Sequence, residues 1–261
     1  MALFKQRFSV TCSAASALLA AAVFSLSAAG ASSSEREHSV ELELGPVWQE
    51  RNKVQIPNDA SGDRFQLTDI AGSGPWASAR VNALWTISGP HSLRLVLAPL
   101  SYSEKGALSE DVRFDGQTFT GRERLRAHYT FNSWRLGYRY SYLDSNGWQL
   151  WVGATAKVRD AEIKLEQGAV KAQDGDLGFV PLLHLAGEYR FDQRWSFQFD
   201  FDGLAGGPGR AIDLGLKLGY RHNDSWRLSA GYRGLEGGAD VDDVYNFAWF
   251  NTALISLQYG Y

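Results

Sequence analysis

Hydrophobic and polar residues alternate along most of this 261-residue chain, with a period of two residues rather than 3.6. In the segment 195–202, the odd positions are Trp195, Phe197, Phe199 and Phe201, and the even positions carry only serine, glutamine and aspartate. Successive side chains of a β-strand point to opposite faces of a sheet, so this alternation predicts strands with one apolar face and one polar face.

Ten segments of this kind are expected to form strands. They lie at 38–50, 76–88, 91–104, 124–143, 147–165, 175–191, 194–203, 210–221, 225–234 and 245–261. Each is long enough for a transmembrane strand, which needs ~9–11 residues. No helical segment or interdomain linker is expected between them. The pattern predicts an all-β fold: a transmembrane antiparallel up-and-down barrel of about ten strands, with eight as the alternative.

The connections between the segments alternate in length. Short turns are expected at 88–91, 144–147, 191–194 and 221–224, and longer polar loops at 51–75, 105–123, 166–174, 204–209 and 235–244. Aromatic residues gather near the short turns, and Trp148, Trp195 and Trp226 follow three of them almost at once. Tryptophan and tyrosine favour a membrane–water interface. Short periplasmic turns opposite longer external loops are typical of outer-membrane barrels.

The first 31 residues have the features of a secretory signal peptide. Lys5 and Arg7 precede an apolar stretch at 14–26, and small residues at 29–31 offer a cleavage site. The sequence therefore predicts a signal peptide at 1–31 and one barrel domain at 32–261. The only cysteine, Cys12, lies before the apolar stretch, so the mature chain is expected to have neither a disulfide nor a cysteine-ligated metal.

Charge and hydropathy exclude two other classes of protein. The chain has 26 lysines and arginines against 29 acidic residues, a net charge of −3, without the basic excess of a nucleic-acid-binding protein. Beyond the N-terminal stretch, no apolar run is long enough for a transmembrane helix. The polypeptide is therefore not expected to bind nucleic acid or to cross a membrane by helices.

The signal peptide, the alternation over 38–261 and the C-terminal segment 255–261 together resemble those of bacterial outer-membrane β-barrel proteins. The last residue, Tyr261, is similar to the C-terminal aromatic residue that the barrel-assembly machinery recognises in this class. The resemblance implies an outer-membrane location, with membrane lipid, lipopolysaccharide and the assembly machinery as partners. Proteins of this class include pores, adhesins, structural proteins and enzymes, so the fold does not decide the function.

If the apolar face meets lipid, charged residues fill the barrel interior. Six of them are expected to form a lumen charge belt: Arg135, Lys157, His184, Asp200, Asp213 and Arg233. Closing the short turns and loops as hairpins places Arg135 towards Lys157, and Lys157 beside His184.

The same hairpin alignment orders the other side of the belt. It places His184 opposite Asp200, Asp200 near Asp213, and Asp213 near Arg233. A salt-bridge network that plugs the lumen is the favoured interpretation, because desolvated charges require partners. The alternatives are a His184–Asp200 base pair or a metal held by His184, Asp200 and Asp213.

Two enzyme families offer further comparisons. Omptins are outer-membrane proteases that carry paired carboxylates and an Asp/His pair at the external rim. Here Asp202, Asp240, Asp242 and Asp243 are expected near that rim without a histidine, which argues against a protease. Outer-membrane lipid A deacylases carry a His-x-Ser pair on the lipid-facing side of a strand.

In this sequence, the best match to the His-x-Ser pair of the lipid A deacylases is His128-Tyr129-Thr130, in which threonine replaces serine.

Three prolines fall within or beside the expected strands: Pro46, Pro99 and Pro181. Proline cannot donate to a strand ladder, so bulges or strand ends above the bilayer are expected there, with bulges favoured and a lateral gap in the wall as the alternative. The run 203–209 is expected to be a flexible hairpin loop rather than a phosphate loop. The acidic stretch 236–243 is expected to be a solvated loop, with weak calcium binding as the alternative.

The sequence thus predicts an outer-membrane barrel with a structural or surface-interaction role and a largely plugged lumen. A narrow pore or lateral transporter for small solutes, and a lipid A-modifying enzyme, remain open as alternatives. No catalytic residue, resident metal or cofactor is assigned, and the sequence leaves the oligomeric state undetermined.

Overall fold

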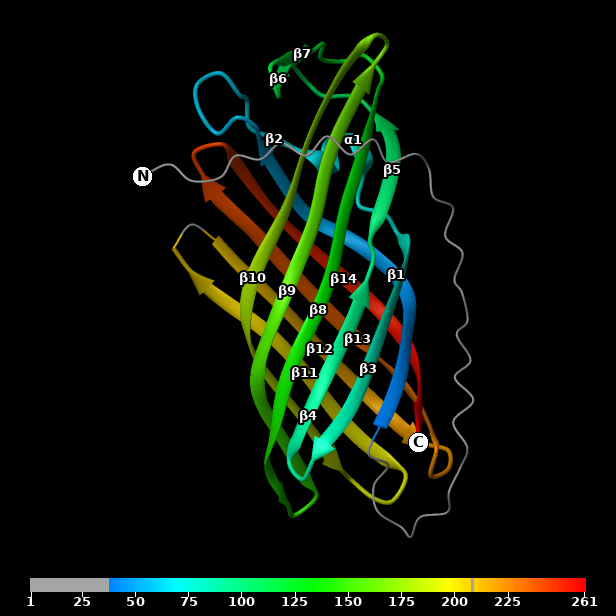
Figure 1. Cartoon of the computed structure of the whole chain (residues 1–261). Helices are drawn as coiled ribbons and strands as arrows, with labels where there is room; N and C mark the ends of the chain where they lie inside the picture. Colours follow the sequence, from blue (N-terminus) through cyan, green and yellow to red (C-terminus); the bar gives the residue numbers. More distant parts are fainter. Residues whose placement is uncertain (1–37, 208) are drawn as a thin grey trace. The chain divides into compact units, whose positions relative to one another are not determined.

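The computed structural model of the chain describes residues 38–207 and 209–261. The predicted signal peptide at 1–31 lies outside the described residues. Within them, the strands form one antiparallel barrel, shown in Figure 1, and the first and last strands pair to close it.

The barrel wall has ten strands in the described part of the chain, as the alternation predicts. They are β1 (His38–Gln55), β3 (Trp76–Ser88), β4 (His91–Ala98), β8 (Leu125–Ser145), β9 (Trp148–Gln167), β10 (Val170–Arg190), β11 (Trp195–Gly206), β12 (Gly209–Arg221), β13 (Trp226–Val241) and β14 (Val244–Gly260). A shorter strand, β5 (Ser101–Gly106), continues from β4 along β8.

The four expected short turns all lie at one end of the barrel, here called the turn end. Asn146 and Gly147 join β8 to β9 with positive φ angles of 54° and 82°, as a tight hairpin turn with this sequence requires. In the next turn, the Asp192 carboxylate accepts hydrogen bonds from the backbone N–H groups of Arg194 and Trp195, both at 2.7 Å. Local side-chain hydrogen bonds therefore fix the direction in which the chain reverses.

The opposite end, here called the loop end, differs from the prediction. The loops expected at 166–174, 204–209 and 235–244 are wrong, because the strands continue through most of these residues and meet in tight hairpins. Polar residues in these segments keep the backbone pairing of the strands, although they lack the apolar alternation by which the strands were recognised.

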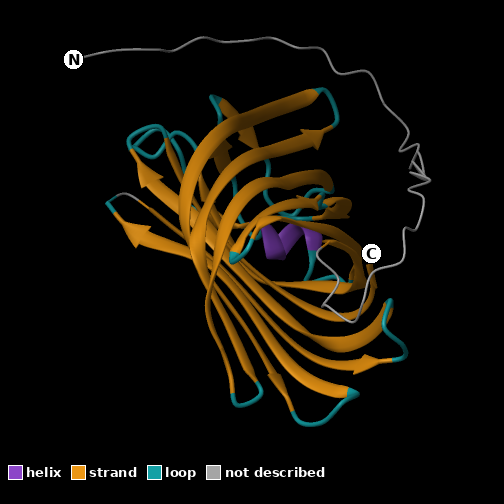
Figure 2. Cartoon of the chain, turned by 60° about the horizontal axis from the view of Figure 1, so that its bottom comes forward, coloured by secondary structure: helices purple, strands orange, loops and turns teal. Residues whose placement is uncertain are grey.

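The segments 51–75 and 105–123 do contain long connections, with small elements inside them. The first holds β2 (Phe65–Gln66) and the helix α1 (Leu67–Ala71), and the second holds the hairpin of β6 (Val112–Phe114) and β7 (Gln117–Phe119). The expectation of no helical segment is therefore wrong. Figure 2 shows α1 inside the ring of strands, where Leu67 and Ile70 are buried. No described helix is long and apolar enough to cross a membrane.

Two seams divide the barrel wall towards the loop end. The pairing of β10 with β11 stops at Leu183 and Gly203, and the pairing of β3 with β4 stops at Val81 and Leu97. Beyond these points the wall forms two lobes, one of β5, β8, β9 and β10, and the other of β11–β14, β1 and β3. Figure 1 shows β10 and β11 diverging at the first seam.

Two of the three prolines mark these seams, and the third, Pro46, lies within β1 opposite Ala77 of β3. Pro181 lies two residues beyond Leu183, and Pro99 lies two residues beyond Leu97, so each follows the last ladder pair of its seam. The register shifts of the described strands lie elsewhere, and the expected bulges at Pro46, Pro99 and Pro181 are therefore wrong. An unpaired strand edge exposes backbone donors, and a proline has no N–H to leave without a partner.

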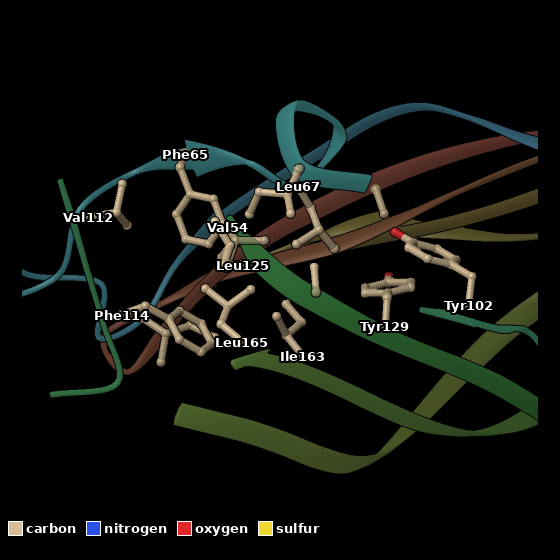
Figure 3. Packing of buried hydrophobic residues seen from close by; sticks show 14 of the residues in the cluster. Val54, Phe65, Leu67, Tyr102, Val112, Phe114, Leu125, Tyr129, Ile163 and Leu165 are labelled. Atoms are coloured by element: carbon tan, nitrogen blue, oxygen red, sulfur yellow. The ribbon is translucent and has the colours of Figure 1, made fainter. Parts of the chain in front are cut away.

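An apolar core fills the space between the two lobes. Figure 3 shows this core below α1, with side chains from both lobes in contact. Its most deeply buried members include Val54, Leu67, Phe114, Tyr129 and Leu165, none more than 1% exposed. The hydrophobic core thus lies inside the barrel at the loop end, and the remaining length of the lumen is polar.

The outward face carries an apolar band and a row of aromatic pairs. Leu136, Leu185, Leu218 and Ile255 are among the large hydrophobic side chains that this face exposes. At the turn end, each tryptophan that follows a turn packs on a tyrosine of the next strand: Trp148 on Tyr189, Trp195 on Tyr220 and Trp226 on Tyr259, with ring centroids 4.9, 5.0 and 4.7 Å apart.

Candidate functional site

The candidate site is a network of buried charges at the level where the two seams begin. The strands alternate here with their apolar residues outward, so every second residue points into the lumen. All six side chains of the predicted belt face inward. Five of them are less than 9% exposed, and Asp200 is partly exposed.

Asp202 is the first centre of this network and is 0% exposed. Its carboxylate accepts hydrogen bonds from Arg94 at 3.0 Å, from Arg135 at 2.7 Å and from the Thr155 hydroxyl at 2.9 Å. The Nδ1 atom of His184 lies 2.8 Å from Oδ1, the same carboxylate oxygen that Thr155 contacts. Four groups from strands β4, β8, β9 and β10 therefore converge on one carboxylate of β11.

Asp213 is the second centre and binds three guanidinium groups. Arg80 donates to it at 3.0 Å and Arg233 at 2.6 Å, and Arg135 donates to it through its second terminal nitrogen. Arg135 therefore bridges Asp202 and Asp213 across the lumen. Charge-assisted hydrogen bonds of this type are stronger than neutral ones and hold both partners in one geometry.

Glu43 extends the network towards the turn end. It accepts from Arg233 at 3.0 Å and from the Lys217 amine at 3.1 Å, and Lys217 also donates to Glu41 at 2.5 Å. These contacts connect β1 with β12 and β13 through the interior, in addition to the backbone ladder.

The observed register corrects the predicted pairing. His184 lies opposite Asp202 rather than Asp200, and Asp202 rather than Asp200 lies opposite Asp213. Asp202, expected at the external rim, belongs to the buried network instead. The turn between β10 and β11 and the hairpin between β11 and β12 are each centred one residue later than assumed, and such a shift exchanges each cross-strand partner for the residue two positions along.

One other predicted neighbour, that of Lys157, also needs correction. Arg135 does lie opposite Lys157, but Lys157 lies opposite Val180 and not beside His184. Arg233 lies opposite Gly215 in the ladder, and its long side chain still reaches Asp213.

Arg94 is a functional member of the network that the sequence analysis missed. Leu93, Leu95 and Leu97 alternate with Arg94 and Val96 in β4, so the period of two was sufficient to place Arg94 in the lumen. Its guanidinium contacts Asp200 and Asp202, both at 3.0 Å.

Lys157 differs from the other belt cations. It is 2% exposed and has no ion pair among the described residues, and its amine lies 4.9 Å from the centroid of the Phe131 ring. The Nε2 atom of His184 is also buried and has no hydrogen-bond partner in the described part of the chain. The network therefore satisfies its carboxylates more completely than its cations.

The geometry does not support the alternative sites proposed for His184. Asp202 could orient the imidazole, but the Thr155 hydroxyl donates to Asp202, and no hydroxyl contacts His184 among the described residues. Those residues contain no group of three or more His, Cys, Asp or Glu side chains that could hold a metal ion. Asp213, one of the expected metal ligands, is occupied by three arginines.

A cavity of about 60 Å³ lies between the charge network and the apolar core. Both edges of the seam between β3 and β4 line it, through Ala79 on one side and Ala98 and Pro99 on the other. The residues that line the cavity include Arg80, whose Nη2 atom is buried without a hydrogen-bond partner in the described structure.

The external rim lacks the Asp/His pair of an omptin. The five histidines of the sequence are all described, and none lies beside Asp240, Asp242 or Asp243. Glu236, at the start of the acidic stretch, forms ion pairs with Arg51 at 2.6 Å and Arg210 at 2.7 Å. This stretch is part of a β13–β14 hairpin rather than a loop.

The His128–Thr130 pair lies on the outward face of β8. The Nε2 atom of His128 is 3.2 Å from the Thr130 hydroxyl, which is within hydrogen-bond distance. Glu162 lies opposite Thr130 in the ladder and accepts a hydrogen bond from Gln173. Among the described residues no carboxylate contacts His128, so the imidazole lacks the orienting group that a general base usually has.

Comparison with known proteins gives matches in structure alone. No protein-family model and no curated protein matches the sequence. The outer membrane protease OmpT from Escherichia coli matches with a TM-score of 0.54 at 9% sequence identity, over 86% of this chain and 96% of that chain. The chain has the fold of a bacterial outer-membrane β-barrel. Its apolar outward band and aromatic pairs agree with location in the outer membrane.

Two other solved structures match with lower TM-scores. Neisserial surface protein A matches this barrel with a TM-score of 0.35 at 14% identity, over 86% of this chain and 97% of that chain. Ail, the attachment invasion locus protein of Yersinia pestis, matches with a TM-score of 0.35 at 10% identity, over 84% and 99%. Identities this low show the fold only.

Proposed function

We propose that this barrel is a closed outer-membrane scaffold whose extracellular lobes serve surface interactions, rather than a pore. The observation that carries the proposal is the double closure of the lumen. The charge network joins opposite walls through Arg135, and the apolar core fills the space between the lobes beyond it.

Both closures would have to open before an ion could pass. In the network, Asp202 and Asp213 each accept hydrogen bonds from several buried donors, and a passing ion would displace them. Breaking a buried ion pair costs about 3–5 kcal/mol. The apolar core adds a barrier of a different kind, because it offers a hydrated ion no polar contacts.

Planar-bilayer recording tests this proposal. The refolded barrel is expected to show no stepwise conductance, and protein from the same preparation that was heat-unfolded before addition serves as the control for contaminating porins. Discrete openings that occur only with the folded protein would overturn the proposal.

A second candidate function is lateral passage of a small apolar solute from the bilayer into the lumen. The cavity at the seam between β3 and β4 favours it, since Ala79 and Ala98 border both the seam and the cavity. Uptake of toluene into proteoliposomes would be compared between the wild type and Ala98→Phe. A matched Val158→Phe variant adds the same ring on the outward face of β9, away from the seam. If Ala98→Phe alone slows uptake, the lateral route is supported; equal uptake by all three proteins would exclude it.

A further inference from the structure

The outward face of one extracellular lobe carries a concentration of positive charge. Its cations are Lys105 on β5, Arg126 on β8, Lys164 on β9 and Lys171 on β10. Arg126, Lys164 and Lys171 alternate with residues of the apolar core, and Lys105 is exposed three residues beyond the buried Tyr102, so their side chains point away from the lumen. They are called the basic face below.

The register of the strands brings these cations into two adjacent rows. Lys105 lies opposite Arg126, and both Arg126 and Lys171 lie opposite Glu166. In the next row, His128 lies opposite Lys164. The rows therefore place cations from four neighbouring strands within reach of one bound group.

Among the described residues, only two of these four cations form an ion pair with a carboxylate. Glu166 lies 3.0 Å from the Lys164 amine and 3.2 Å from the Lys171 amine. Lys105 and Arg126 form no ion pair with any described residue. The basic face thus offers unpaired positive charge at the surface, together with the hydrogen-bonding pair of His128 and Thr130.

The height of the basic face matches the headgroup layer of the membrane. Towards the periplasm, the same outward surface becomes apolar at the row formed by Leu97, Trp134, Val158 and Phe179. Between the two surfaces lie the rows of Asn132 with Asp160 and of Thr130 with Glu162, and Lys164 is four residues beyond Asp160. Four residues of a tilted strand rise about 10 Å along the membrane normal. Lys164 therefore lies about 10 Å beyond Asp160, at the depth of the lipid headgroups outside the hydrocarbon.

The outward arginines of the other lobe differ in their pairing. There, Arg51 and Arg210 share the carboxylate of Glu236, and Lys53 forms no ion pair with any described residue. Among the described residues, Lys105 and Arg126 of the basic face have no such shared carboxylate.

We propose that the basic face binds the phosphate groups of a phosphorylated glycolipid in the outer leaflet, the chemical class of lipopolysaccharide. Lys105 and Arg126 contact phosphate as unpaired cations, and Lys164 and Lys171 do so together with Glu166. The acyl chains of the same lipid lie along Trp134, Val158 and Phe179. This inference depends on the outer-membrane fold and is independent of whether the lumen conducts.

Binding of bisphosphorylated lipid A to the barrel in nanodiscs tests the proposal. The test variant is Lys105→Gln/Arg126→Gln, and the matched control is Lys53→Gln/Arg210→Gln, which removes two cations from the other lobe. Each lysine or arginine near an anionic membrane surface adds to the affinity for the lipid. Loss of two of them is expected to weaken the binding of lipid A about thirtyfold. The control variant should bind like the wild type.

Dephosphorylated lipid A separates phosphate recognition from acyl-chain contact. The wild type is expected to bind it as weakly as the test variant binds the phosphorylated form, and added salt should weaken only binding of the phosphorylated form. Equal binding of both lipids by the wild type, or equal loss in the test and control variants, would overturn the proposal. Heat-modifiability on gels, measured in detergent, confirms that each variant is folded.

Discussion

Replacement of Asp213 by asparagine perturbs the charge network with little change in side-chain volume. The native carboxylate accepts hydrogen bonds from Arg80, Arg135 and Arg233, and its side chain is 3% exposed. In Asp213→Asn the three guanidinium groups keep their charges and lose their shared counter-ion. The asparagine NH₂ group is also a donor and cannot replace a carboxylate oxygen as an acceptor.

The magnitude follows from burial. Removing one partner of a buried ion pair leaves an uncompensated charge and costs about 3–5 kcal/mol. The matched change Glu236→Gln removes a carboxylate that also binds two arginines, but its partners Arg51 and Arg210 are 32% and 41% exposed. Water can solvate those arginines, so a loss of about 0–1 kcal/mol is expected.

Urea unfolding of both variants in phospholipid vesicles, followed by tryptophan fluorescence, measures the difference. Adding Arg80→Met to Asp213→Asn should recover part of the lost free energy of unfolding, because one of the unpaired charges is then absent. If Asp213→Asn costs no more than Glu236→Gln, the buried charges do not act as a network, and the structural role assigned to them is incorrect.

Three further predictions concern other parts of the barrel. Burial, together with Asp115, Asp176 and Asp243, raises the pKa of Asp174 in the part of β10 at the loop end. The folded state therefore holds this proton more tightly than the unfolded state, and stability falls as pH rises through the folded pKa. Asp174→Asn should raise the urea midpoint at pH 7 and leave it unchanged near pH 3; a lower midpoint at pH 7 would contradict this. Gly147→Ala places a side chain at a φ of 82° and should cost about 1 kcal/mol of unfolding free energy, whereas Gly137→Ala, without a positive φ, is the comparison for the same change inside β8. We further propose that Tyr261 is read by the assembly machinery: its deletion should reduce the amount of folded barrel in cells while leaving refolding of the purified chain into detergent unchanged, and reduced refolding would instead indicate a structural role.

The period-two alternation was enough to predict the strands and the side of the wall on which most charges lie. It placed Trp195 and Phe197 outward and His184 inward, because these residues sit on strands whose faces differ sharply in polarity. The Asn146–Gly147 turn was recognisable because its residue types fit positive φ angles. Strand count and turn positions therefore follow from local chemistry.

Register could not be obtained in the same way. The partner of His184 depends on how many residues the hairpin between β10 and β11 holds outside the ladder, and a difference of two residues exchanges Asp200 for Asp202 without changing which face either residue occupies. The period-two alternation is the same before and after a shift of two residues, so it cannot reveal the register. The helix α1 was missed for a related reason, since five residues are too few to show a helical period.

The positions of the charge network and the apolar core inside the barrel follow from the way in which the strands of the wall are paired. Below the seams, backbone hydrogen bonds run around the whole barrel, so the wall needs no apolar interior and the lumen can hold Asp202 and Asp213 with their arginines. Beyond the seams, no ladder joins β10 to β11 or β3 to β4, and the two lobes would be free to separate. Burial of residues such as Leu67 and Tyr129 between them supplies the missing attraction, because it removes apolar surface of both lobes from water. The apolar core therefore begins where the continuous ladder ends, and the charge network lies at the boundary between the two.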